Sequence, residues 1–164
     1  MIKKILIALK LLFIGITISN SATALDCDFT NLIGGNIPLN FGIYNPLENN
    51  ALQISTDISF ECGPDIFFVT PYTIELVITG GNFQNGSRVI LGPAGNNLPF
   101  ILATDQQCLN EIKNNAVIFN RVDQFPRKRT YRFTIFGCVF PGQFVSVGQY
   151  QTNLRSIIRT RRGR

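Results

Sequence analysis

The stretch Gln53-Ile54-Ser55-Thr56-Asp57-Ile58-Ser59-Phe60-Glu61-Cys62 decides the fold class of this chain. Its apolar side chains, together with Thr56, fall on every second residue, and the residues between them are polar or charged. A strand with one face against a core and the other in water has this period of two, whereas an amphipathic helix repeats at about 3.6 residues. The stretch therefore predicts a half-buried β-strand.

Alternating or short apolar patterns predict further strands, and turn residues separate these segments. Gly80-Gly81, Asn85-Gly86, Gly92-Pro93 and Pro141-Gly142 mark the turns, and Asn85-Gly86 favours a tight hairpin. Pro99 favours an edge or a strand start, because proline cannot donate a ladder hydrogen bond. Many short strands with this punctuation are typical of a β-sandwich or barrel. The predicted strands span residues 72–79, 87–91, 97–104, 129–139 and 149–160.

Residues 105–125 do not follow the alternating pattern. We interpret them as a long connection tied down by Cys108, with a helical turn at 111–113 and a short strand at 116–119. No internal repeat, low-complexity tract or linker divides the rest of the chain. One domain over residues 25–164 is therefore the simplest organisation.

The first 24 residues have the pattern of a secretory signal peptide. Lys3 and Lys4 precede an apolar stretch at residues 5–18, and Ala22-Thr23-Ala24 matches an A-x-A cleavage site. The alternative is a membrane anchor, but the stretch is short for a span and Lys10 interrupts it. We expect cleavage after Ala24 and export of residues 25–164 through the periplasm to the cell surface or medium.

The four cysteines are an even set in a chain that is predicted to leave the cytoplasm. Disulfides form and persist in such a compartment. Zinc is the alternative, but no two cysteines have C-x-x-C spacing and the chain has no histidine. Four cysteines allow three pairings, which sequence alone leaves open. We prefer Cys27–Cys62 and Cys108–Cys138, since sequential pairing suits strands that run out and back.

Composition argues against an enzyme. The 164 residues include no histidine, which excludes a Ser–His or Cys–His pair and any histidine metal ligand. Carboxylates are scattered, and Asp26 and Asp28 are interpreted as solvated positions on one strand face. No phosphate-binding glycine loop is present. We expect no catalytic residue, metal or cofactor.

The net charge of +5 is concentrated at the two ends of the chain. Three lysines lie in the predicted signal peptide, and Arg159, Arg161, Arg162 and Arg164 form a basic tail. The run Arg127-Lys128-Arg129 is interpreted, with Arg132, as a solvated loop. No nucleic-acid partner is expected, because the exported part lacks broad basic character.

One ordered set of motifs resembles a known family. The segment Phe41-Gly42-Ile43-Tyr44-Asn45-Pro46-Leu47, followed by the alternating strand that ends at Cys62, is similar to the F-G-x-Y-D/N-P segment of the spore coat protein U domain. Ser87-Arg88 resembles that family's S-R pair. Its C-terminal motifs resemble Pro141-Gly142-Gln143 and the stretch from Gly148 through Tyr150. The domain occurs in subunits of archaic chaperone–usher pili.

The resemblance implies an immunoglobulin-like β-sandwich that lacks its last strand and is completed by a donor strand. It also implies three kinds of partner: a periplasmic chaperone, an outer-membrane usher and sibling pilus subunits. The expected task is structural or adhesive. Tyr150, Leu154 and Ile158, or Ile157 on the other face, are the candidate groove-side residues of the last strand.

Two departures from the family bear on the expected role. Cleavage after Ala24 would leave only Leu25 and Asp26 before Cys27, so the subunit could accept a strand but hardly donate one, as expected of a terminal subunit. The hydrophilic Arg159–Arg164 stands where the family usually ends on apolar residues. The alternative function is a self-sufficient secreted β-sandwich that binds a surface glycan or another anion.

Overall fold

The structure is a computed structural model that describes residues 25–63 and 71–162. The predicted signal peptide lies outside the described residues. Ten strands and two short 3-10 turns follow in order along the described chain. They are β1 (Asp26–Phe29), η1 (Ile33–Gly35), β2 (Asn36–Tyr44), β3 (Leu52–Gly63), β4 (Pro71–Thr79), β5 (Asn82–Gln84), β6 (Ser87–Leu91), η2 (Pro93–Gly95), β7 (Asn97–Ala103), β8 (Ala116–Gln124), β9 (Arg129–Val139) and β10 (Gly148–Arg162).

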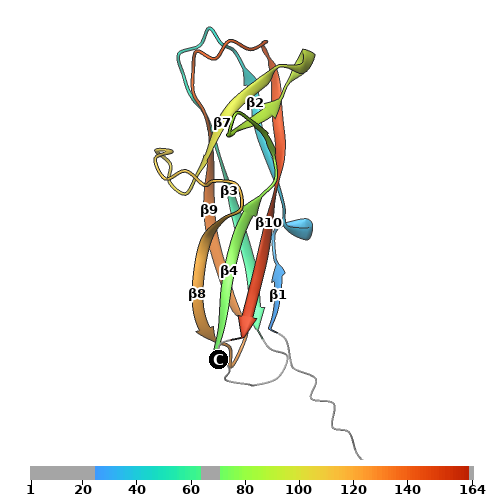
Figure 1. The fold of residues 1–164 in the computed structure, drawn as a ribbon, viewed down its shortest axis with the longest axis vertical. Helices are drawn as coiled ribbons and strands as arrows, with labels where there is room; N and C mark the ends of the chain where they lie inside the picture. The colour runs from blue at the N-terminus through green and yellow to red at the C-terminus, as the bar shows by residue number, and fades with distance from the viewer. Residues whose placement is uncertain (1–24, 64–70, 163–164) are drawn as a thin grey trace, which may run out of the picture.

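The strands form two antiparallel sheets that pack face to face as an elongated sandwich (Figure 1). One sheet has the order β1-β3-β9-β7-β6-β5, and the other has the order β2-β10-β4-β8. The all-β sandwich predicted from alternation is therefore confirmed. Inward positions of both sheets bury a continuous apolar core, which includes Ile58 and Phe60 from the alternating stretch at residues 53–62.

Local turn chemistry explains two details of the sheets. The β5–β6 hairpin turns at Asn85 and Gly86, both with positive φ (50° and 82°), as a two-residue hairpin turn requires. Pro99 lies inside β7 and not at its start. However, residues 97–100 pair only with β6, because pairing to β9 begins at Ile101. The strand is therefore a local edge at Pro99, where proline is tolerated.

The prediction for residues 105–125 is wrong in two respects. The strand β8 runs for nine residues and pairs along β4, and Glu111 forms an isolated bridge to Ala103 instead of a helical turn. Pairing between β4 and β8 shifts register at Leu76/Val77, which breaks the period of two. The second half of β8 is also polar, because one face meets solvent.

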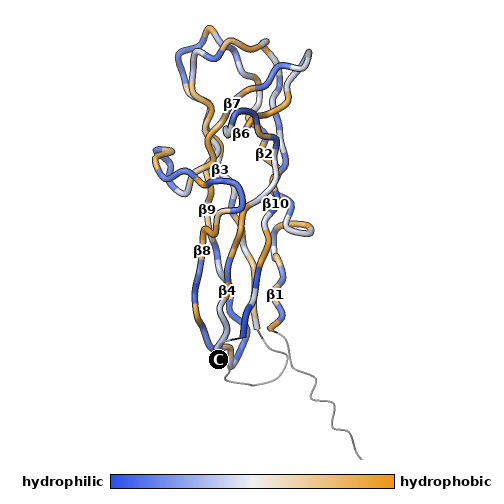
Figure 2. The backbone as a smooth tube through the Cα atoms, in the orientation of Figure 1, coloured by the Kyte–Doolittle hydropathy of each residue, from blue (hydrophilic) through white to orange (hydrophobic). Residues whose placement is uncertain are grey.

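The last strand extends further than predicted. It continues to Arg162, so that Arg161 and Arg162, like Arg159 inside the predicted range, are strand residues and do not form a free tail. Figure 2 shows the same strand turning from hydrophobic to hydrophilic toward its C-terminal end. The arginines are held in sheet register by pairing to β4, from Arg159 opposite Glu75 to Arg162 opposite Tyr72.

Two disulfides join the preferred cysteine pairs. Cys27 on β1 is bonded to Cys62 on β3, its direct cross-strand partner. Cys108, in the connection after β7, is bonded to Cys138 on β9. The first bridge fastens a four-residue edge strand to the sheet, and the second anchors the connection at residues 104–115.

Candidate functional site

The motif Phe41-Gly42-x-Tyr44 is a β-bulge in β2. Tyr150 pairs with Gly42 and Gln151 pairs with Asn40, so Phe41 is the extra residue. Gly42 has a φ of 74°, which costs an L side chain free energy and suits glycine. The bulge changes the spacing of inward residues from two to three. Phe41 and Tyr44 consequently both point into the core.

The N-terminal and C-terminal motifs meet at one pole of the sandwich. Gly148 pairs with Tyr44 and Tyr150 pairs with Gly42 across β2 and β10. Pro46 follows in the tight turn in which the Glu48 amide donates to the Asn45 carbonyl at 3.1 Å. The family-motif residues named from the sequence are therefore brought together here. They are Phe41, Gly42, Tyr44, Pro46, Gly148 and Tyr150.

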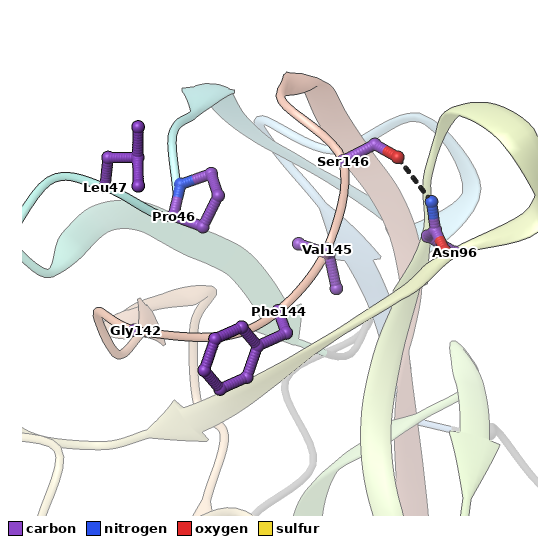
Figure 3. Close-up of a pocket in the computed structure, with 7 residues that line it drawn as sticks. All are labelled: Pro46, Leu47, Asn96, Gly142, Phe144, Val145 and Ser146. Atoms are coloured by element: carbon purple, nitrogen blue, oxygen red, sulfur yellow. Dashed lines mark hydrogen bonds between the residues drawn. The ribbon is translucent and has the colours of Figure 1, made fainter.

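A shallow open pocket of about 590 Å³ lies at this pole (Figure 3). Pro46, Leu47, Phe144 and Val145 supply most of its lining, and the Asn96 amide donates a 2.6 Å hydrogen bond to Ser146 Oγ at its rim. Phe144 is fully exposed. Sequence reasoning missed the exposed Phe144, because a lone phenylalanine in a loop carries no periodic signal.

The opposite half of the sandwich has an open strand edge. The side of β10 away from β4 is paired with β2 as far as Arg155. Beyond it, Ser156 Oγ donates to the Gly35 carbonyl at 2.8 Å, where the chain crosses from β1 in one sheet to β2 in the other. From Ile157 to Arg162, no strand of the described chain pairs with that side of β10. We call this segment the open edge.

Burial falls along β10 as it enters the open edge. The inward residues Ser156, Ile158 and Thr160 are buried, half-buried and exposed in turn. Their direct partners on β4 are Ile78, Leu76 and Ile74, each 0% exposed. The core therefore stays covered at β4 and becomes uncovered one strand away, on the side where no described strand lies beside β10.

The four predicted groove-side residues lie on different faces and in different halves of β10. Tyr150 and Leu154 point into the core, but they lie in the half of β10 that β2 covers. Ile158 points inward at the open edge and packs against the core cluster. Ile157 lies on the outer face beside Arg159. Of the four residues, Ile158 is thus the one that combines an inward side chain with the open edge.

The outer face of the open edge is basic. Arg159 and Arg161 are exposed there, and in the described part of the chain neither makes an ion pair within 4.0 Å. Arg127 and Arg132 are also exposed. The run at 127–129 is exposed, as predicted, but two of its cations are paired: Lys128 Nζ lies 3.4 Å from Glu61 Oε1, and Arg129 Nη1 lies 2.6 Å from Asp123 Oδ1.

The other long side of the same half is closed by a polar and aromatic cluster. Tyr131 Oη donates to Asp123 Oδ2 at 3.0 Å, and Phe119 packs against Tyr131 with 5.4 Å between ring centroids. Desolvation and then the bond to Asp123 raise the pKa of Tyr131 to about 12. Burial opposes ionisation of Asp123, but hydrogen bonds from Tyr131, the Gln124 amide and Arg129 outweigh it and lower its pKa.

A buried arginine joins the β4–β5 turn to the connection before β8. Arg88, from the Ser87-Arg88 pair, donates from Nη1 to the Gly80 carbonyl at 2.5 Å and from Nη2 to the Lys113 carbonyl at 3.4 Å. Its guanidinium lies 4.9 Å from the centroid of the Phe83 ring. Desolvation lowers the pKa of Arg88, and nearby Glu111 opposes the shift. The contacts indicate a structural clamp.

In residues 25–63 and 71–162, no group of three or more histidine, cysteine or acidic side chains is placed to hold a metal ion. Over the same residues, no helix has the length and hydrophobicity to cross a membrane.

The described chain is thus a sandwich with paired sequence motifs at one pole and an open edge in the opposite half. A model of the Spore Coat Protein U domain matches residues 15–155, which is most of the chain. The chain belongs to this family, as its motifs predicted. The family is one of structural, fimbrial-type subunits and is not known as enzymatic.

The match ends just before the open edge. It contains the six motif residues from Phe41 to Tyr150, whereas Ile157–Arg162 lies beyond it. No curated protein matches the chain.

Proposed function

We propose that this chain is an exported, non-catalytic subunit of a chaperone–usher type pilus, and that a strand from a partner completes its sandwich at the open edge. The observation that carries the proposal is the fall in burial from Ser156 to Thr160 opposite fully buried β4 residues. An added strand would cover those positions and satisfy the backbone groups of Ile157–Arg162. This is β-augmentation. An unpaired edge is otherwise an aggregation hazard.

The proposed partners follow from family membership. A periplasmic chaperone would supply the strand first, and a sibling subunit would replace it at an outer-membrane usher. If the mature chain begins at Leu25, Asp26 is already part of β1 and little remains to donate. The subunit would then be terminal in its fibre. Mass spectrometry of the exported protein gives the mature N-terminus that decides this point.

Alanine variants of the adjacent residues Ile157 and Ile158, whose side chains lie on opposite faces of β10, test whether the open edge accepts a strand. The protein is coexpressed with the chaperone from a neighbouring gene, and the yield of the complex is measured after gel filtration. I158A should reduce the yield because it removes the inward apolar contact, whereas I157A, which alters the outer face, should change it little. Equal yields from the two variants contradict the proposal.

Hydrogen exchange provides a second readout. The amides of Ile157–Arg162 that do not face β4 should exchange rapidly in the free protein and become protected in the complex. Protection that is already complete in the free monomer would mean that the edge is not open.

The alternative, a self-sufficient sandwich that binds a surface glycan or another anion, has one observation in its favour. Arg159 and Arg161 are exposed and without an ion pair among the described residues. A soluble, cooperatively unfolding monomer that binds an anionic polysaccharide, and has no affinity for chaperone or donor peptide, would favour this alternative.

A further inference from the structure

The open edge has a chemical asymmetry that goes beyond its capacity to accept a strand. Side chains on its inward face are close to the apolar core, whereas those on its outward face include exposed cations. Inward, Ile158 and Thr160 border the apolar core. Outward, Arg159 and Arg161 are exposed cations in register on one strand.

Charge on the sheet around these arginines is only partly balanced. Glu75 lies directly opposite Arg159 on β4, but Thr73 lies opposite Arg161 and Thr79 lies opposite Arg155. The acidic residues of β1, Asp26 and Asp28, belong to the other sheet and are exposed on its outer face. A strand added to β10 would therefore place its outward side chains in a row beside cations that β4 neutralises incompletely.

We propose that the open edge selects an acidic donor: an extended segment of another protein with apolar residues at alternate positions and carboxylates on the opposite face. The inference rests on the proposed function and names the chemistry of the partner strand. Opposite charges on neighbouring strands stabilise pairing, and like charges oppose it. Ile157–Arg162 has room for about six residues of such a segment.

The same arrangement disfavours a second copy of this chain that uses its own open edge. Two such edges side by side would bring Arg159 and Arg161 against their counterparts. Like charges on adjacent strands are a recognised means of preventing edge-to-edge pairing. The arginines would thus favour the correct donor and limit self-association.

Three synthetic peptides of about 12 residues, comparable to a long natural strand, test the inference. One alternates valine with glutamate, one alternates valine with serine, and one has the composition of the first in scrambled order. Binding to the exported, disulfide-bonded protein is measured by fluorescence anisotropy at low and high salt. We expect the alternating glutamate peptide to bind about tenfold more tightly than the serine peptide at low salt, and to lose most of this advantage at high salt.

A matched pair of charge-reversal variants locates the effect. R159E/R161E should abolish the preference for glutamate, whereas R127E/R132E, with the same change in net charge at exposed positions away from the open edge, should retain it. Because all four side chains are exposed, we expect both variants to fold. Loss of the preference in both variants overturns the inference, since net charge alone would then account for it.

The outcomes separate this inference from the proposed function. Equal affinity for the glutamate and serine peptides overturns the acidic donor and leaves strand acceptance standing. Equal affinity for the scrambled peptide means that charge acts without strand pairing, which also overturns it. Failure of every peptide to bind overturns both proposals. An edge-to-edge dimer in sedimentation analysis overturns the acidic donor, because the arginines would then not prevent pairing between two copies.

Discussion

Tyr44 and Tyr150 pack edge to face, with 6.2 Å between ring centroids and an interplanar angle of 89°. They are 0–1% exposed and belong to motifs at opposite ends of the chain. Each also holds the loop at residues 140–147. The Gln143 amide donates to Tyr44 Oη at 2.8 Å, and Tyr150 Oη donates to the Ser146 carbonyl at 2.7 Å. The two tyrosines therefore hold this loop against β2 and β10 at one pole of the sandwich.

Removing either hydroxyl should loosen that loop. Y44F leaves the Gln143 amide without its acceptor and Y150F leaves the Ser146 carbonyl without its donor, so each should cost about 1–2 kcal/mol of unfolding free energy. Urea denaturation measures the loss. F144S, at a fully exposed position in the same loop, is the control and should cost little. A double variant that loses less than the sum would show that the hydroxyls act as a unit.

The bulge at Gly42 should resist substitution for backbone reasons alone. Its φ is 74°, and a Cβ at this position would meet no atom within 4 Å. G42A should cost about 1–2 kcal/mol from the left-handed conformation, and G42N less, because asparagine tolerates it better. Thermal unfolding of the three proteins gives the order. A loss for G42N equal to or above that for G42A would contradict the backbone explanation.

The Asp123–Tyr131 pair should make stability depend on pH at both extremes. Asp123 has a lowered pKa, so its contribution is present above about pH 4, the unfolded value, and is lost as pH falls through the folded one. Tyr131 has a raised pKa, so its contribution is present below about pH 10 and is lost as pH rises through about 12.

Denaturant titrations across this range check both signs. D123N should reduce the loss of stability at acid pH, and Y131F should reduce the loss at alkaline pH. D28N, an exposed residue of β1, is the control and should leave the profile unchanged. If the wild type loses no more unfolding free energy at acid pH than D123N does, Asp123 does not contribute to that loss.

The Arg88 clamp should require a guanidinium and not merely a positive charge. R88K keeps the charge but loses the forked geometry that reaches both the Gly80 and Lys113 carbonyls, so we expect a loss of about 1–3 kcal/mol. Limited proteolysis should also cleave the connection at residues 104–115 sooner. R132K, at an exposed site, should match the wild type in both assays.

Strands could be predicted from the sequence where the alternating pattern or the turn residues lie within a few adjacent positions. The alternation from Gln53 to Cys62 predicted β3, and the Asn85-Gly86 pair predicted its hairpin, because both signals lie within a few adjacent residues. Only residues 116–119 of β8 were predicted, since a register shift against β4 interrupts the period of two. The strand β2 was not predicted, although its inward residues alternate from Ile37 to Phe41, because the bulge changes the spacing before Tyr44.

For the candidate site, the sequence named Ile158 and its neighbours without distinguishing their surroundings. Alternation separates Ile158 from Ile157 by face, because successive side chains of a strand point to opposite sides. It does not reveal that β2 covers β10 only as far as Arg155. That limit depends on where the chain crosses between sheets, a contact between Gly35 and Ser156 that are far apart in sequence.

The sequence by itself determined that this protein is an all-β, disulfide-containing member of its family, because alternation, turn residues, cysteines and short motifs are local properties of the chain. Only the tertiary structure decided that Tyr44 and Tyr150 are partners, that Arg161 and Arg162 are strand residues, and that Ile157–Arg162 is an open edge. These are relationships between strands, and strand order and register arise only when both sheets pack around one core.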